Sequence, residues 1–180
     1  MTKEEKAPAV SVDASRFIML HGDIDSGNVR DVIKQLFEFN LKDTEKPIYL
    51  FVNSYGGTAH EMFALYDVIR NTTAPIYSTI LGKSMSAGVL ISASGAKGHR
   101  KIGKHATLMI HPMFGVNFGN IFEQDDALQE QKRLQQMMED AYTEVSNLTK
   151  KQVKELMEDG RNKYFSAEEA VKMGFADIII

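Results

Sequence analysis

The 180-residue chain contains no cysteine, which excludes a disulfide framework and thiolate chemistry. This absence fits a reducing compartment, and we expect a cytoplasmic protein. The net charge of −3 provides no general basic field, so we expect no nucleic acid as a partner. No apolar run approaches the length of a membrane span, and the polar segment Met1–Pro8 lacks the apolar core of a secretory signal. We therefore also expect no membrane partner.

Paired metal ligands are also missing, because the five histidines show none of the short spacings typical of metal sites. We expect neither a metal nor a cofactor. The composition is that of an ordinary globular protein, with 43% hydrophobic and 25% charged residues. The length fits one domain with a substantial core. We expect a flexible N-terminal segment at residues 1–15 and a single domain over residues 16–180.

Apolar runs alternate with amphipathic segments through the first part of the chain. Each run is short, as strands are, and helical spacing of apolar residues fills most of the intervals. This alternation is typical of an α/β fold with a parallel sheet and right-handed crossovers. In such sheets, sites form beyond the carboxyl ends of the strands. The expected strands are residues 17–20, 48–52, 76–80 and 106–110, with residues 53–57 expected as a loop.

Three features that catalysis could use follow these runs. Ser86 lies among small residues after the third run, His111 follows the fourth, and Gly56–Gly57 lie just beyond the second. A serine becomes a useful nucleophile only on a sharp turn, near a base and near spare backbone N–H groups. Each feature alone has a commoner structural explanation, such as a surface serine, a hydrogen-bonded histidine or a tight turn. Their joint occurrence at strand ends favours nucleophilic catalysis.

The second half of the chain leaves one segment ambiguous. Residues 113–120 place Gly115 and Gly119 between apolar residues, and two interpretations are equally open. The segment is either an extended stretch that accepts a peptide by strand addition or a hairpin or glycine-rich loop. Residues 121–148 form the longest helical pattern, whose length suggests that part of the helix projects. Further on, Ser166–Glu169 fits a capping box that opens another helix.

From residue 17 to residue 180 the chain resembles the proteolytic subunit of the Clp (caseinolytic) ATP-dependent protease. Five segments carry the resemblance in matching order and spacing: a strand with its glycine loop, a serine turn, a second turn, a histidine segment and a C-terminal signature. The resemblance implies a crotonase-like β-α superhelix with a protruding handle, at about residues 113–148, that interlocks two rings. The five segments are Ile48–Gly57, Gly82–Gly88, Gly95–Arg100, Met109–Pro112 and Phe165–Gly174.

Carried over by position, the resemblance implies that Ser86 is the nucleophile and His111 the general base. It places the oxyanion donors on the backbone N–H groups of Gly57 and Ala87. The segment after the histidine would line the groove that binds the peptide substrate. The residues expected to bind substrate there are Met113, Phe114, Gly115 and Val116.

The third triad position departs from the family pattern, because Asn162 stands where the family has an aspartate. An amide can accept a hydrogen bond from the histidine, but it cannot stabilise the imidazolium with a full charge. In a serine-protease triad this replacement costs about four orders of magnitude in kcat. Asp159 lies near in sequence and would substitute if the loop were shifted.

The resemblance implies a serine-type endopeptidase that hydrolyses peptide bonds inside a chamber of stacked heptameric rings, with peptides or unfolded proteins as substrates. The first alternative is a catalytically weak or inactive ring subunit, which Asn162 favours. The second is a stand-alone peptidase that needs no ATPase, because residues 3–15 differ in character from the family's axial gate. Docking of an AAA+ unfoldase partner is therefore left open. Acyl-CoA chemistry on the same broad fold needs no pairing of Ser86 with His111, which argues against it.

Overall fold

The computed structural model describes residues 14–180. The expected flexible segment at residues 1–15 therefore lies outside the described residues, apart from its last two. Those two belong to a short 3-10 helix, Ala14–Arg16. The remainder folds as one α/β unit around a single sheet, in agreement with the expected α/β class and its parallel sheet.

A mainly parallel sheet of seven strands forms the centre of the described chain. Its strands are β1 (Phe17–Ile24), β2 (Ile48–Gly57), β3 (Ile76–Met85), β4 (Lys101–Ile102), β5 (Thr107–Ile110), β6 (Lys163–Phe165) and β7 (Ile178–Ile179). Strands β1, β2, β3, β4 and β7 lie side by side in that order and run parallel. β5 pairs in parallel with the end of β3, and β6 runs antiparallel to β5. The parallel crossovers expected from the sequence are thus present.

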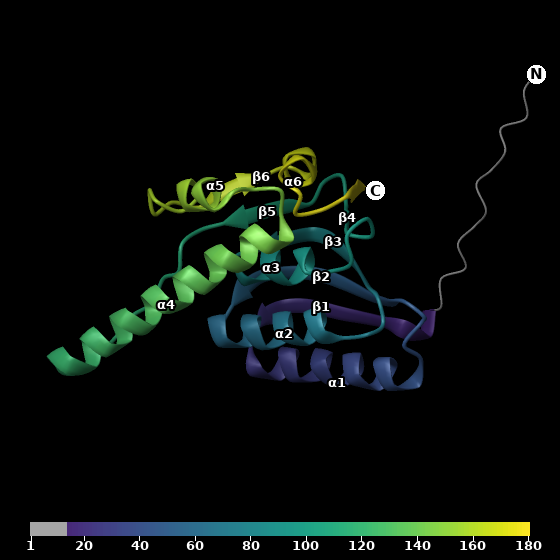
Figure 1. Cartoon of the computed structure of the whole chain (residues 1–180), viewed down its shortest axis with the longest axis horizontal. Coiled ribbons are helices and arrows are strands. Elements are labelled where there is room, and N and C mark those ends of the chain that lie inside the picture. The colour runs from purple at the N-terminus through teal and green to yellow at the C-terminus, as the bar shows by residue number, and fades with distance from the viewer. Residues whose placement is uncertain (1–13) are drawn as a thin grey trace, which may run out of the picture.

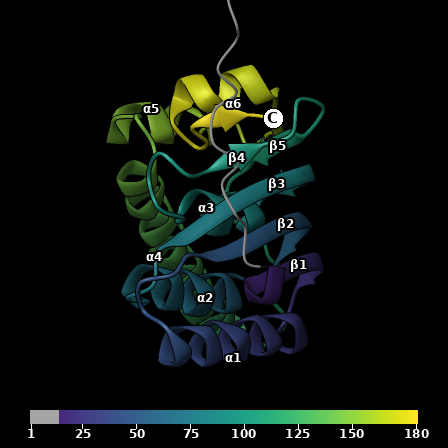
Figure 2. The same cartoon turned by 90° about the vertical axis from the view of Figure 1, so that its right-hand side faces the viewer.

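Six α-helices surround this sheet in the described chain. They are α1 (Ser26–Lys42), α2 (Ala59–Asn71), α3 (Ala87–Ala93), α4 (Ile121–Val145), α5 (Lys150–Glu155) and α6 (Ala167–Met173). α1 packs against β1 and α2, whereas α3 packs against β2, β3 and α4. Figure 1 shows α1 and α2 together on one side of the molecule and α4 extending away from its body. Figure 2 shows the strands stepping from β1, beside α1, toward the end that carries α6.

β2 and β3 both continue beyond the apolar runs that predicted them. The expectation of a loop at residues 53–57 is wrong, because those residues are the end of β2. Ser54 and Ser84 lie opposite each other on the two strands and are completely buried. The Ser54 hydroxyl accepts a hydrogen bond from the Gly56 N–H, and the Ser84 hydroxyl shares one with Ser92. Because these polar groups are satisfied inside the protein, buried serines can continue both strands beyond their apolar runs.

The helix ends follow the capping residues of the sequence. The Asp25 carboxylate accepts a hydrogen bond from the Asn28 N–H, so Asp25 is the cap of α1. The capping box at Ser166–Glu169 is confirmed at the start of α6. α4 also starts with a capping box, at Asn120, and ends at Val145, before the end predicted at residue 148.

The segment between β5 and α4 contains neither helix nor strand over residues 111–120. The structure therefore excludes a hairpin but leaves the glycine-rich loop open, and peptide binding by this segment stays a prediction. The C-terminal half of α4 buries one face against the core through Leu134, Met138, Ala141, Tyr142 and Val145. Its N-terminal half is exposed and projects, as the length of the helical pattern suggested (Figure 1). Within residues 14–180, no helix is long and apolar enough to cross a membrane.

Candidate active site

Ser86 is the single residue between β3 and α3. Its φ of 53° makes it the only non-glycine residue with a positive φ among residues 14–180. Its N–H donates to the Met109 carbonyl at 2.7 Å, and its side chain does not cap α3. A serine held on a strained turn between a strand and a helix is the arrangement in which Oγ is presented as a nucleophile.

Gly56 and Gly57 let the end of β2 pass directly beside this serine. A Cβ atom added to Gly56, whose φ is 104°, would lie 2.7 Å from the Ser86 Cβ. A Cβ atom added to Gly57 would collide with the backbone of Ile24 on β1. Only glycine therefore fits at either position without moving the backbone. The close approach explains why two glycines follow the second apolar run.

His111 follows β5 directly, and its Nε2 lies 2.8 Å from the Ser86 Oγ. In the tautomer protonated at Nδ1, Nε2 accepts the hydroxyl proton, which is what a general base must do. β5 pairs with the end of β3 so that Met109 lies opposite Met85, and the residues that follow both strands are brought together. The structure therefore joins two residues that the sequence placed at separate strand ends.

Two adjoining cavities surround the Ser86–His111 pair. The larger has a volume of about 820 Å³ and is also lined by Gly57 and by the acidic residues Asp23 and Asp25. The smaller has a volume of about 240 Å³ and shares Ser86, His111 and Gly57 with the larger one. Its remaining walls are mainly apolar and include Ala59, Met62, Ala87, Met113, Phe114 and Met138. The pair thus faces an open groove with an apolar side pocket.

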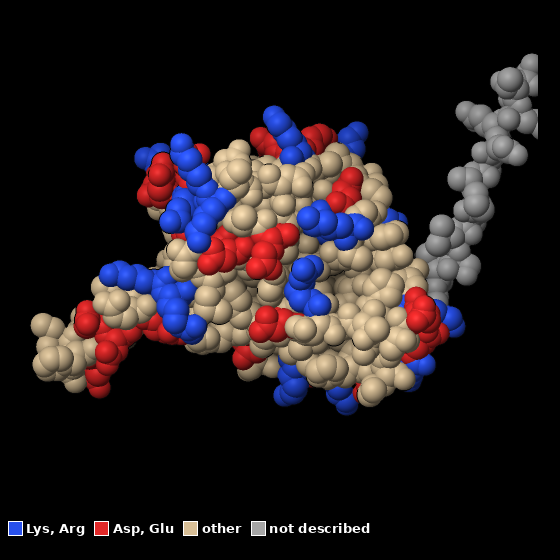
Figure 3. All heavy atoms as spheres, in the orientation of Figure 1, with Lys and Arg blue, Asp and Glu red and all other residues tan. Residues whose placement is uncertain are grey.

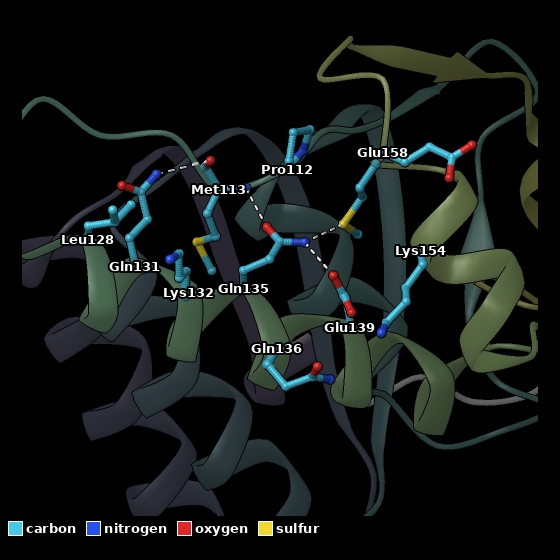
Figure 4. A pocket seen from close by; sticks show the side chains of 11 residues that line it. Pro112, Met113, Leu128, Gln131, Lys132, Gln135, Gln136, Glu139, Lys154 and Glu158 are labelled. Carbon is cyan, nitrogen blue, oxygen red and sulfur yellow. Dashed lines mark hydrogen bonds between the residues drawn. The ribbon is translucent and has the colours of Figure 1, made fainter.

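Two glutamines of α4 hold the start of the segment that follows His111. The Met113 N–H donates to Gln135 Oε1 at 2.7 Å, and Gln131 Nε2 donates to the Met113 carbonyl at 3.2 Å (Figure 4). Gln135 Nε2 in turn donates to the buried Glu139 carboxylate at 2.9 Å. Sequence reasoning missed these residues. Their spacing of four, which places all three on one face of α4, was the available signal.

Only part of the predicted substrate-binding segment faces the candidate site. Met113 lines the smaller cavity, and Phe114 lines both cavities although its side chain is 82% exposed. Gly115 and Val116 are exposed and line neither of these cavities. The structure therefore brings the first two residues of the segment to Ser86 and leaves the other two at the surface.

Asn162 lines the larger cavity together with Ser86 and His111. β6 pairs with β5 so that Lys163 lies opposite Ile110. Continuing this register by one residue places Asn162 opposite His111. Among the described residues, however, the only hydrogen bond of the His111 side chain is the one to Ser86. Asn162 thus lies beside the histidine, and its role as the third triad member stays a prediction.

Asp159 does not line either cavity around Ser86. Its carboxylate accepts a hydrogen bond from the Arg161 N–H and lies 3.5 Å from the Lys163 ammonium group. The hydrogen bond from Arg161, with the charge of Lys163, lowers the pKa of Asp159. These contacts hold the carboxylate within its own loop, and among the described residues it makes no hydrogen bond to His111. The arrangement does not support Asp159 as a replacement for the missing aspartate.

Residues 3–180 match the family model described as Clp protease. The chain belongs to the Clp protease family. It is 32% identical over 167 residues to the ATP-dependent Clp protease proteolytic subunit of Streptococcus suis (strain 98HAH33), a match that covers 92% of this chain and 84% of that protein. It is 28% identical over 166 residues to the ATP-dependent Clp protease proteolytic subunit 3 of Synechococcus sp. (strain CC9902), covering 92% and 82%.

Membership of the Clp protease family agrees with the resemblance found in the sequence. It supports a serine-type peptidase, and so favours peptide hydrolysis over acyl-CoA chemistry on the same broad fold. The Ser86–His111 pair, the glycines beside it and the groove around it lie within the matched residues.

Proposed function

We propose that this chain is a Clp-type serine endopeptidase subunit in which Ser86 and His111 carry out the chemistry. The 2.8 Å contact between Ser86 Oγ and His111 Nε2, on a strained turn that opens into a groove, is the observation that carries the proposal. Ser86 Oγ attacks the scissile carbonyl while its proton moves to His111 Nε2. His111 then gives this proton to the leaving amine, and water hydrolyses the acyl-enzyme by the same route.

The negative charge on the tetrahedral intermediate needs N–H donors, and two are available next to Ser86. Ala87 is the first residue of α3, so its N–H has no acceptor within the helix. The Thr58 N–H donates to Ile24 on β1. Because successive N–H groups of an extended chain alternate in direction, the Gly57 N–H is directed away from β1, toward the side of β3. We assign the oxyanion hole to the backbone N–H groups of Gly57 and Ala87.

The groove also accounts for the recognition of substrate. An extended peptide lying in the larger cavity can place the side chain that precedes the scissile bond in the smaller one. Three methionines line this pocket, Met62, Met113 and Met138, and their flexible thioethers adapt to apolar side chains of different shape. We therefore assign a preference for an apolar residue before the cleaved bond. Met113 and Phe114 form one wall of the groove.

The proposal includes a homo-oligomer, most simply stacked heptameric rings that enclose the active sites. The projecting end of α4 and the segment before it carry apolar side chains that are more than three-quarters exposed, including Phe118, Ile121 and Phe122. Figure 3 shows this end as an uncharged tip, whereas charges of both signs are interspersed over the rest of that face. An apolar surface of this kind marks an interface. We assign α4 and residues 113–120 as the handle, within a crotonase-like superhelix.

An unfoldase partner stays a prediction, as does cytoplasmic location.

The specific observation that favours the inactive alternative is the lack of a hydrogen bond between His111 and Asn162 in the described residues. The experiment compares cleavage of short fluorogenic peptides by the wild type, Ser86→Ala and His111→Ala, with Ser26→Ala, an exposed serine at the start of α1, as the control. We expect cleavage by the wild type and the control only. Equal cleavage by Ser86→Ala would refute the proposal, and no cleavage by the wild type would favour a structural subunit.

A further inference from the structure

Tyr142 reaches from α4 to the backbone of the candidate nucleophile. The side chain is completely buried, and its ring packs edge-on against Phe175, with the ring centroids 5.6 Å apart. Its hydroxyl donates to the Ser86 carbonyl at 3.2 Å, which is the hydroxyl's only hydrogen bond within residues 14–180. A buried phenol needs a hydrogen-bond partner, and here the partner is the backbone of Ser86, the proposed nucleophile.

The carbonyl that Tyr142 holds belongs to the same peptide group as the Ala87 N–H. A trans peptide is planar, and its C=O and N–H point in opposite directions. No peptide bond between the described residues is cis. A donor that holds the Ser86 carbonyl on the buried side therefore directs the Ala87 N–H toward the opposite side. Ala87 lines the smaller cavity beside Ser86, so this side is the active-site cavity.

The Ser86–Ala87 peptide needs to be held, because the turn is strained. Ser86 has φ 53° and ψ −123°, values that a serine rarely adopts. Rotation of this peptide would relieve the strain, but it would turn a carbonyl oxygen toward the place where the oxyanion develops. The Val89 N–H also donates to the Ser86 carbonyl, at 3.0 Å, so the carbonyl has two donors. Rotation would break both bonds and leave the buried Tyr142 hydroxyl without a partner.

We propose that Tyr142 is a positioning residue for the oxyanion hole, since it fixes the Ser86–Ala87 peptide in the orientation that aims the Ala87 N–H at the tetrahedral intermediate. The inference rests on the proposed function of Ser86, Ala87 and His111. It deepens that function by assigning a role to a side chain of α4 that touches neither substrate nor the reacting atoms.

The state of the phenol agrees with a permanent donor. Burial raises the pKa of Tyr142 above its ordinary value of about 10, so the hydroxyl keeps its proton at every pH at which peptides are normally assayed. Tyr66, a residue of α2, provides a contrast, because its hydroxyl also bonds to α4. Its hydroxyl donates to the Glu144 carboxylate at 2.9 Å, and its pKa is raised to about 12 by burial and by that carboxylate. Tyr66 bonds α2 to α4, and its hydroxyl makes no hydrogen bond to the Ser86 turn within residues 14–180.

The experiment compares Tyr142→Phe with Tyr66→Phe. Each variant loses one tyrosine hydroxyl whose hydrogen bond joins α4 to another part of the fold. Peptide cleavage and thermal unfolding are measured for both variants and the wild type. We expect Tyr142→Phe to lower kcat by about threefold to tenfold, as expected for one lost neutral hydrogen bond, with little change in KM. We expect Tyr66→Phe to retain the kcat of the wild type, although its unfolding temperature also falls.

A second measurement separates the oxyanion hole from general loosening of the site. A dipeptide boronic acid forms a tetrahedral adduct with a serine hydroxyl and places a boron-bound oxygen in the hole, whereas the same dipeptide as a carboxamide binds without an adduct. We expect Tyr142→Phe to weaken inhibition by the boronic acid by the same factor as kcat, and to leave inhibition by the carboxamide unchanged. Equal weakening of both inhibitors would indicate a loosened groove and would overturn the inference.

The remaining outcomes are also decisive. If the wild type cleaves peptides and Tyr142→Phe has the same kcat, the inference is overturned and the proposed function stays intact. Loss of folding in Tyr142→Phe, with Tyr66→Phe folded, shows that the hydroxyl is structural and likewise overturns it. A wild type that neither cleaves peptides nor binds the boronic acid contradicts the proposed function, and the inference fails with it.

Discussion

Each polar group of Ser86 is held by a different part of the fold. Its N–H is bonded to Met109 on β5, its hydroxyl to His111, and its carbonyl to Tyr142 on α4 and Val89 on α3. These contacts keep the serine in a backbone conformation that it would not adopt alone. The residue that most concerns the chemistry of Ser86 and His111 is Asn162, which lines the larger cavity together with both of them.

We predict that Asn162→Asp raises kcat on a short peptide, with little change in KM. The added carboxylate stabilises the imidazolium only as it forms in the transition state, and the gain can reach orders of magnitude. Steady-state kinetics on samples of verified oligomeric state provide the measurement, with Asp159→Asn as the control, since Asp159 is held within its own loop. An unchanged kcat in a correctly assembled Asn162→Asp protein would mean that Asn162 is not the third member.

Ser86 and His111 could be found from the sequence because each lies beyond an apolar run. Ser86 lies among small residues, and His111 directly follows its run. The register between β5 and β6, which sets Asn162 beside His111, could not be found, because β6 is only three residues long and has no clear pattern. Tyr142 could not be recognised either. Its position fits the apolar face of a helix, and only the three-dimensional packing shows where its hydroxyl points.

α4 is the element that connects the exposed apolar tip with the candidate active site. Its C-terminal half is part of the core, and it bonds to the Ser86 carbonyl and to the Met113 backbone. Helical periodicity predicted this element. The contacts of its polar residues could not be predicted, because the sequence left the path of the segment before the helix open. The two glutamines fix that path, because they occupy both backbone groups of Met113.

We predict that Gln135→Ala lowers kcat/KM for peptides by about fivefold, which corresponds to about 1 kcal/mol for one lost hydrogen bond. Without Gln135 the Met113 N–H loses its acceptor, and the wall that Met113 and Phe114 contribute to the groove is less well fixed. Gln136→Ala is the matched control, because Gln136 is the next residue on α4 and bonds only to Asp140 on the same helix. The same kcat/KM in both variants would contradict a positioning role for Gln135.

On the scale of the whole molecule, a largely buried ion pair joins parts of the chain that are distant in sequence. Arg100 is buried and lies 2.6 Å from the Asp177 carboxylate, before β7. The same guanidinium donates to the carbonyls of Ala93 and Val145, at the ends of α3 and α4. Breaking a buried pair by removing one charge leaves the other uncompensated. The pair therefore ties the C-terminal strand to the two helices that carry the site.

We predict that Asp177→Asn lowers the free energy of unfolding by about 3 kcal/mol at neutral pH. Burial opposes the charged carboxylate, but the hydrogen bonds and charge of Arg100 leave the pKa of Asp177 below its ordinary value. The stabilisation is thus present above pH of about 4 and is lost as the pH falls through the lowered pKa. Denaturant unfolding between pH 7 and pH 3 should show the difference from the wild type shrinking in acid.

The control for this experiment is Asp140→Asn, which removes an exposed ion pair with Lys150. Surface pairs contribute about 0 to 1 kcal/mol, so this variant should unfold almost like the wild type. A loss for Asp177→Asn that is no larger than the loss for Asp140→Asn would show that the buried pair does not stabilise the fold as described.

We predict that the protein is a large homo-oligomer and that a Phe118→Ser, Phe122→Ser double variant forms smaller particles. Both side chains are more than three-quarters exposed at the projecting end of α4. Burying them between subunits would stabilise the assembly, because it removes apolar surface from water. Light scattering at micromolar concentration provides the measurement, with Leu41→Ser, an exposed residue of α1, as the control. A wild-type monomer across salt concentrations would be the contrary result.

The covalent reactivity of Ser86 tests the central claim most directly. The protein is treated with a fluorophosphonate, and the modified residue is identified by peptide mass spectrometry in the wild type, Ser86→Ala and His111→Ala. The account predicts a single phosphonylated residue, Ser86, with no labelling of Ser86→Ala and much slower labelling of His111→Ala, because the hydroxyl reacts only when His111 removes its proton. A wild type that remains unmodified at Ser86, or that is labelled equally fast without His111, would contradict it.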